Sequence, residues 1–376
     1  MTYENPFEYG KPVTGKKFIG RKKEVKRLTS ELLSGQSIIL YSPRRVGKTS
    51  LIKQTLTSIP ANEAITAYVD LYGISSKREL VGKIVNETLR SAYPTYAAFK
   101  KFAEIILRRI PIKIISIKDI VKIELGRESD ISTNVLEEAF DLPESIGQKM
   151  NKRVIVAFDE FQDIYALDGE HIEKLMRSRF QHHQKTAYIF AGSKTSMMQE
   201  MFGGYERAFY NFGTTMKIDN IPEEEFEVFI KDRFETTKKK IATDIIRRIL
   251  AFTNGHPYFT QKICHRIWND TEKVVNEASI KRTVDDITAD EADKYERMWD
   301  SLTAAQRRFL FGLLGPQKKI YSYEFIAAND LKTASHVKKI FNSMLDKRII
   351  NERGEIADIF FREWLRELSD NISMDV

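Results

Sequence analysis

The stretch SIILYSPRRVGKTSL, residues 37–51, constrains the fold more than any other part of this sequence. The apolar run at 37–40 predicts a buried strand, and apolar residues at helical spacing after the stretch predict a helix. The loop between them ends in Gly47-Lys48-Thr49, and such a loop between a strand and a helix is typical of a phosphate-binding site. The chain is therefore expected to contain a parallel sheet that presents this loop at its edge.

Each residue type at the end of this loop suits a bound diphosphate. Gly47 permits the unusual backbone angles that bring N–H groups close to phosphate, and the helix N-terminus adds partial positive charge. Lys48 is expected to reach the β- and γ-phosphates, and the Thr49 hydroxyl to bind Mg²⁺. Ser42 stands where such loops usually open with glycine, but it is small enough to be tolerated. The alternative is a chance Gly-Lys-Thr in a surface loop, which the strand and helix context disfavours.

The rest of the loop is expected to contact phosphate through its backbone. The side chains of Arg44 and Arg45 are therefore predicted to point into solvent. The loop residues that we expect to bind the cofactor are Pro43, Arg44, Arg45, Val46, Gly47, Lys48, Thr49 and Ser50.

Five short apolar segments predict the strands of the sheet. Helical patterns separate most of them, the first at 22–34, and this alternation is typical of an α/β fold with helices on both faces of a parallel sheet. The predicted strands are SIIL at 37–40, AITAYVD at 64–70, RVIVAF at 153–158, TAYIFAG at 186–192 and TTMKI at 214–218. We therefore expect a P-loop α/β domain over residues 1–220.

Two carboxylates follow the third of these strands. Ligands of open α/β sheets bind at the carboxyl ends of strands, where Asp159 and Glu160 are expected to lie. Asp159 is suited to hold Mg²⁺, and Glu160 to orient and polarise an attacking water. An Asp-Glu pair after a strand can also serve only as a helix N-cap, but the loop upstream favours a functional role.

Two further polar residues follow later strands. The Ser193 hydroxyl is a candidate contact for the γ-phosphate or the attacking water, with a loop cap as the alternative. Arg207 is a candidate source of positive charge for the transferring phosphoryl group, with a surface salt bridge as the alternative.

The remaining sequence predicts an insertion and two further domains. Residues 92–132 interrupt the α/β rhythm with a predicted hairpin to which we assign no function. Residues 221–298 read as all helical, and we expect a separate helical domain there. Residues 299–376 predict three helices followed by a hairpin that turns near Gly354, an order typical of a winged-helix domain.

Charge and composition limit the class of protein. The net charge is +7, and residues 1–60 carry twelve Lys/Arg against four Asp/Glu, so the positive excess surrounds the phosphate-binding loop. This distribution favours a polyanionic small ligand. The single cysteine, Cys264, excludes an internal disulfide and fits a reducing, cytoplasmic location. The N-terminus does not resemble a signal peptide, and no apolar run is long enough to span a bilayer, so no membrane partner is expected.

Six segments occur in the order seen in STAND-type AAA+ ATPases. They are FIGRKKEVKRL, SPRRVGKTSL, VIVAFDEFQ, AGSKTSMM, RAFY and NGHPY. The sequence most closely resembles the predominantly archaeal and bacterial "archaeal ATPase" family, over roughly residues 5–370. The resemblance implies a P-loop NTPase parallel sheet of AAA+/STAND type, followed by an all-α lid and a winged-helix domain. ATP, ADP and Mg²⁺ are the implied cofactors.

The resemblance also implies roles for individual residues. The segment Phe18, Ile19, Gly20 and Arg21 resembles the one that lies along adenine and ribose. Ser193 is similar to the first sensor of AAA+ proteins. Arg207 stands where the family has an arginine after Tyr-Gly, although Glu206 precedes it here. Pro257 matches the proline that packs on adenine and couples the lid to bound nucleotide.

Three functions follow from these features. The first is an ATP-driven switch in which slow hydrolysis resets the lid and winged helix, with an unidentified protein partner. The second is an ATPase that docks its winged helix on DNA. Residues 301–376 carry twelve Lys/Arg against ten Asp/Glu, which weakens this reading, whereas Ser335, Lys339 and Asn342 on one predicted helix face support it. The third, a catalytically inactive scaffold, is disfavoured because the expected site residues are all present: Lys48, Thr49, Asp159 and Glu160.

Overall fold

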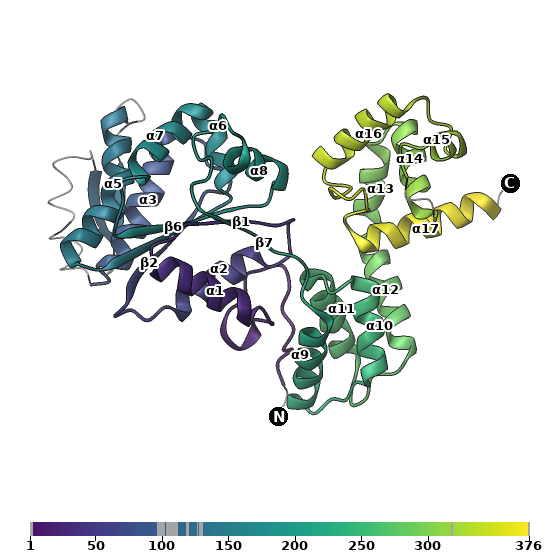
Figure 1. The fold of residues 1–376 in the computed structure, drawn as a ribbon. Helices are drawn as coiled ribbons and strands as arrows, with labels where there is room; N and C mark the ends of the chain where they lie inside the picture. The colour runs from purple at the N-terminus through teal and green to yellow at the C-terminus, as the bar shows by residue number, and fades with distance from the viewer. Residues whose placement is uncertain are drawn as a thin grey trace. The chain divides into compact units, whose positions relative to one another are not determined.

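The protein folds into two compact units in the computed structural model (Figure 1). One unit is Tyr9–Glu225, and the other combines Met1–Glu8 with Phe226–Val376. The residues that the structure describes are 3–95, 102, 112–117, 120–125, 127, 131–316 and 319–374.

A five-stranded parallel sheet forms the centre of the first unit, as the sequence predicts. The strand order is β2-β5-β6-β1-β7, and every neighbouring pair is parallel. The five expected strands are all present, with ends that agree to within one residue. They are β1 (Ile38–Tyr41), β2 (Ala64–Asp70), β5 (Arg153–Asp159), β6 (Thr186–Gly192) and β7 (Thr214–Lys217).

Helices cover both faces of this sheet, which explains why its central strands are apolar throughout (Figure 1). In β5, Val154 and Phe158 pack in the core under one helical layer, and Ile155 and Ala157 pack in the core under the other. One layer consists of α1 (Lys22–Leu33) and α2 (Lys48–Ser58), and the other of α3 (Lys77–Ala92), α5 (Thr133–Met150) and α7 (Glu170–Phe180). Shorter elements of this unit among the described residues are η1 (Gly15–Lys17), η3 (Phe161–Ile164), α6 (Tyr165–Asp168) and α8 (Thr195–Gly203).

The predicted hairpin in the insertion is confirmed. Strands β3 (Ile112–Ile117) and β4 (Ile120–Leu125) pair with each other in antiparallel orientation and form a separate two-stranded sheet. Much of the remainder of 92–132 lies outside the described residues.

The second unit begins with a helical region, as expected. The aromatic ring of Phe7 is 1% exposed and packs against Phe229 and Phe234. The His265 ring bonds the Phe7 carbonyl at 2.7 Å, so residues 3–8 pack with helices far away in sequence. The helices are α9 (Glu223–Thr236), α10 (Thr243–Thr253), α11 (Pro257–Asp270) and α12 (Ala278–Asp290).

The C-terminal part has the expected three helices and the hairpin. The three helices are α14 (Ala304–Leu314), α15 (Tyr323–Ala328) and α16 (Ala334–Asp346); α13 (Ala292–Asp300) precedes them, and a last helix that the sequence analysis missed, α17 (Ile359–Met374), follows the hairpin. A single antiparallel bridge, Ile350 to Ile356, closes the hairpin around Gly354, where φ is +77°. Phe360 in the last helix packs edge-on against Phe259 of α11, with ring centroids 5.8 Å apart.

The helices of the described residues do not include a membrane-spanning one. None of the helices there combines the length and the apolar character that crossing a bilayer requires.

Candidate functional site

The loop between β1 and α2 has the backbone that a phosphate cradle requires. Arg45 and Gly47 both adopt positive φ, at +64° and +96°. A Cβ added at Gly47 would meet nothing within 4 Å, so backbone conformation rather than space favours glycine there. Ser42 is fully buried at the end of β1, and its φ is not positive. The position therefore does not need the conformational freedom of glycine, which explains how serine is accommodated.

The side chains of the loop point in different directions. Pro43, Arg44 and Arg45 are exposed, and the Arg44 guanidinium lies 5.9 Å from the ring centroid of Tyr72. Two other loop residues expected at the site, Val46 and Ser50, are buried. The Ser50 hydroxyl accepts a hydrogen bond of 3.0 Å from the Val13 backbone N–H, which ties the N-terminal segment to α2.

Lys48 and Thr49 meet the carboxylates that follow β5. The Lys48 ammonium lies 2.9 Å from Asp159 Oδ1 and 3.1 Å from Glu160 Oε1. The Thr49 hydroxyl donates a hydrogen bond of 2.6 Å to Asp159 Oδ2. Because Lys48 and Asp159 are each less than 6% exposed, this ion pair is screened little by water. The structure thus brings together two adjacent pairs, residues 48–49 and 159–160, that are about 110 positions apart in the sequence.

Glu160 is held by three side chains. Besides Lys48, the Ser193 hydroxyl and the Gln162 amide donate to its Oε2 at 2.6 and 2.7 Å. Burial alone would raise the pKa of Glu160, but Lys48, Ser193 and Gln162 outweigh it and hold the pKa below its usual value. Glu160 also has a positive φ of +52°, a strained conformation that is common at functional sites. The carboxylate is therefore charged at neutral pH and fixed in orientation.

Two residues of this cluster were missed by the sequence analysis. Tyr68 on β2 donates a hydrogen bond of 2.9 Å from its hydroxyl to Asp159 Oδ2. Burial, and then the charge of Asp159, raises the pKa of Tyr68 far above its ordinary value, so the hydroxyl remains a donor. Gln162 follows Glu160 by two positions and is 2% exposed. The only sequence signals were a tyrosine within an apolar strand and a glutamine beside two carboxylates.

Arg21 lies inside the protein rather than beside a solvent-filled groove. It is 3% exposed, and its guanidinium donates to the Val46 carbonyl at 3.0 Å and to the Asp219 carbonyl at 2.6 Å. Its backbone N–H donates to Glu225, and the same carboxylate lies where a Cβ on Gly20 would stand. Arg21 thus links the segment 18–21 to the phosphate-binding loop and to the chain that follows β7.

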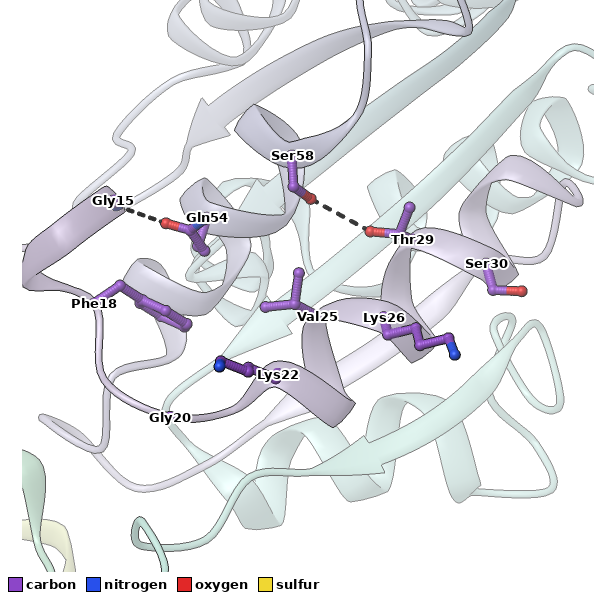
Figure 2. A pocket seen from close by; sticks show the side chains of 10 residues that line it. All are labelled: Gly15, Phe18, Gly20, Lys22, Val25, Lys26, Thr29, Ser30, Gln54 and Ser58. Carbon is purple, nitrogen blue, oxygen red and sulfur yellow. Dashed lines mark hydrogen bonds between the residues drawn. The ribbon is translucent and has the colours of Figure 1, made fainter. Parts of the chain in front are cut away.

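The other residues of this segment face different surroundings. Ile19 is buried, at 4% exposure, whereas Phe18 is only partly buried. Phe18 and Gly20 line a hollow of about 580 Å³ between α1 and α2 (Figure 2). Gln54 stands on its α2 side and accepts a hydrogen bond of 2.7 Å from the Gly15 backbone N–H.

Arg207 is engaged with acidic side chains. Its guanidinium lies 2.5 Å from Glu173, 3.3 Å from Glu170 and 3.7 Å from Glu200. Burial raises the pKa of Glu173, which is 1% exposed, and Arg207 offsets part of that rise. In this structure Arg207 therefore stabilises a buried carboxylate.

Pro257 belongs to the other compact unit. It is the first residue of α11, and Asn254 and Gly255 before it adopt positive φ at the end of α10. This is the helix stop and start that the sequence predicts.

The residues at the site fit a magnesium nucleotide. A hydroxyl and a carboxylate, from Thr49 and Asp159, are oxygen donors of the kind that Mg²⁺ prefers. Among the described residues, no three His, Cys, Asp or Glu side chains gather as a metal-binding group. In nucleotide sites Mg²⁺ is commonly held by one or two protein ligands together with phosphate oxygens and water.

Comparisons with known proteins agree with this geometry. A family model described as "ATPase domain predominantly from Archaea" matches residues 18–263, and one described as "Probable winged helix domain" matches residues 293–367. A comparison with curated protein sequences gave no match.

Two solved structures share the fold along nearly the whole chain. The Walker-type ATPase PABY2304 of Pyrococcus abyssi is 18% identical with a TM-score of 0.68, and the similarity covers 96% of this chain and 99% of that one. The Aeropyrum pernix ORC1 protein, solved in complex with DNA, is 11% identical with a TM-score of 0.51, and the coverage is 96% and 95%. The family match spans well over half of the sequence, so this protein belongs to the family of ATPase domains found predominantly in Archaea, and it carries a winged-helix domain after its P-loop ATPase domain.

Proposed function

We propose that this protein is a STAND-type switch that binds Mg²⁺-ATP and hydrolyses it slowly. The observation that carries the proposal is the cluster of Lys48, Thr49, Asp159 and Glu160 at the carboxyl edge of the sheet, joined by contacts of 2.6 to 3.1 Å. In this proposal Lys48 binds phosphate oxygens, and Thr49 and Asp159 hold Mg²⁺. Bound Mg²⁺ would neutralise charge on the phosphates.

Glu160 is the proposed base for the attacking water, and Ser193 orients it. In the structure Lys48 contacts Oε1 of Glu160, and Ser193 and Gln162 contact Oε2. Phosphate oxygens compete for the Lys48 ammonium, so nucleotide binding is expected to free Oε1 for water. Arg207, the fourth proposed catalytic residue, would have to leave Glu173 before it could contact phosphate. This requirement is consistent with slow hydrolysis.

The proposed output is a change in the second unit. We propose three domains, 1–220 for ATP, 221–298 as a lid and 299–376 as a winged helix, with Pro257 reporting the nucleotide to the lid. The proposed base contacts are Phe18, Ile19 and Gly20. Arg21, with its guanidinium on the Val46 carbonyl, supports the loop rather than touching the base. The partner would be another protein in the cytoplasm, where a single buried free thiol, Cys264, is stable.

Calorimetry and limited proteolysis test the switch. Lys48→Ala should abolish tight Mg²⁺-ATP binding, because the ammonium that faces the phosphates is removed. Mg²⁺-ATP should protect the segment 290–299 of the wild-type protein from cleavage, and Pro257→Ala should reduce that protection more than it reduces ATP affinity. Mg²⁺-ATP binding by Lys48→Ala as tight as that of the wild type would refute the proposed nucleotide site. Cleavage at the same rate with and without nucleotide would refute the proposed switch.

DNA binding through the winged helix is the second candidate function. The winged-helix family match and the DNA complex of the ORC1 protein favour it, and Ser335, Lys339 and Asn342 on α16 are all exposed. Affinity for random duplex should then fall steeply with salt, and Lys339→Glu should lower it further. Salt-sensitive binding that is lost in Lys339→Glu, with cleavage indifferent to nucleotide, would replace the switch by a DNA-binding ATPase.

A further inference from the structure

The hydroxyl of Tyr68 is part of the hydrogen-bond shell of Asp159. Tyr68 lies on β2 opposite Ala157 of β5, two residues before the pair formed by Asp70 and Asp159. Its hydroxyl donates to Asp159 Oδ2 at 2.9 Å, and the Thr49 hydroxyl donates to the same oxygen at 2.6 Å. A residue 91 positions away in the sequence thus fixes one oxygen of the carboxylate.

The other side chains that contact Asp159 already have roles in the proposed function. Oδ1 accepts a hydrogen bond of 3.0 Å from the Glu160 backbone N–H and pairs with the Lys48 ammonium at 2.9 Å. The proposed function assigns Lys48 to phosphate and Thr49 to Mg²⁺, so neither is a permanent support of the carboxylate. Among the side chains that the structure shows in contact with Asp159, Tyr68 is the one to which the proposed function assigns no ligand.

Tyr68 is itself held on two sides. Its ring is partly buried against the core between the sheet and the layer of α1 and α2. The Lys53 ammonium, from α2, lies 4.7 Å from the ring centroid. Strand and helix together therefore limit the movement of the hydroxyl, which lets it hold the carboxylate in one orientation.

We propose that Tyr68 is a positioning residue that orients Asp159 for Mg²⁺. The proposal rests on the proposed Mg²⁺-ATP function and adds a residue to its metal site. Hydrogen bonds from outer groups to ligating carboxylates fix their direction, and their loss costs about 10- to 100-fold in metal affinity. Tyr68 does not touch the nucleotide in this proposal, so it controls the metal requirement rather than nucleotide affinity as such.

Tyr68→Phe tests the proposal because it removes only the hydroxyl. We expect the Mg²⁺ concentration at half-maximal thermal stabilisation by ATP to rise about 10- to 100-fold. Mn²⁺ binding in the presence of ADP, followed by electron paramagnetic resonance, should weaken by a similar factor. ADP affinity in excess chelator should stay within twofold of wild type, which shows that the nucleotide cradle is intact. Tyr72→Phe is the matched control, because it removes a hydroxyl from an exposed tyrosine nearby and should change none of these values.

A double-mutant comparison separates local from general effects. Tyr68→Phe should add no further loss of Mn²⁺ affinity to Asp159→Asn, since the hydroxyl acts through that carboxylate. Additive losses, or a Mg²⁺ midpoint in Tyr68→Phe within twofold of wild type, would overturn the inference. Those results would leave the proposed function standing, whereas failure of the wild-type protein to bind Mg²⁺-ATP at all would refute the proposed function itself.

Discussion

The guanidinium of Arg21 donates a hydrogen bond of 3.0 Å to the backbone carbonyl of Val46, inside the loop that precedes α2. The same guanidinium holds the Asp219 carbonyl, and Glu225 accepts the Arg21 backbone N–H. Arg21 therefore couples the phosphate-binding loop to the chain that leads from β7 into α9. The segment 18–21 thus supports the loop through the hydrogen bonds of Arg21.

Arg21→Ala should weaken ATP binding by at least tenfold while the protein remains folded. It leaves the buried Val46 carbonyl without its donor, at a cost of about 1–3 kcal/mol, and part of that cost falls on the loop conformation. The part-buried contact with the Asp219 carbonyl is lost as well. Isothermal titration with Mg²⁺-ATP measures the effect. Arg27→Ala, which removes an exposed arginine from α1, the helix that follows Arg21, is the control. An affinity within threefold of wild type for Arg21→Ala would show that the loop does not depend on this contact.

Glu160→Gln should bind ATP but lose most hydrolysis. The amide keeps the shape of the side chain and is a far poorer base, and loss of a general base typically costs about 10²- to 10⁴-fold in rate. A steady-state phosphate-release assay and calorimetry, run on the same preparation, check the two halves of the prediction. A rate within threefold of wild type would remove Glu160 from its proposed role.

Arg207→Ala should destabilise the protein by about 3 kcal/mol, because it leaves Glu173 buried without its partner. Glu173→Gln in the same chain should recover a large part of this loss, since an amide is cheaper to bury than a carboxylate. Urea unfolding of the single and double variants measures both values. A loss below about 1 kcal/mol for Arg207→Ala would show that the ion pair contributes little and that Arg207 is free to act elsewhere.

Ser42→Gly should leave ATP affinity almost unchanged, within about threefold. Ser42 is buried and has no positive φ, so glycine offers no conformational gain there. Its flexibility should instead lower stability by about 0.5–1 kcal/mol. A large increase in ATP affinity in a calorimetric titration would mean that serine holds the loop in a weakened form.

Asp141 should make the free energy of unfolding depend on pH in the acid range. Burial would raise the pKa of Asp141, but its hydrogen bonds with His183 and Arg179 lower it from 3.8 to about 2. A lowered pKa in the folded state means that the contribution is complete above pH 4 and is lost as the pH falls toward 2. After allowance for solvent screening, we expect this contribution to the free energy of unfolding to be about 1 kcal/mol. Chemical unfolding of the wild type and of Asp141→Asn from pH 5 to 2 measures it, and parallel curves would refute the assignment.

The sequence by itself determined the sheet and the phosphate-binding loop. The central strands are short, mostly apolar runs because helices cover both faces of the sheet, and the loop is recognised from Gly47, Lys48 and Thr49 between a strand and a helix. These signals are local, since a few adjacent residues carry the periodicity and the backbone requirement. The hairpin of the insertion and helices α14, α15 and α16 of the winged helix were predicted for the same reason, whereas α17 lacked a recognised pattern of its own.

Only the tertiary structure decided which side chains meet. The strand order places β2 beside β5, and this brings Tyr68 to Asp159 across 91 residues. Packing likewise buries Arg21 and places its guanidinium on the Val46 carbonyl. It also pairs Arg207 with the carboxylate of Glu173. No local pattern encodes these pairs, because the free energy that selects them comes from burial and charge pairing between segments that the folded chain alone makes neighbours.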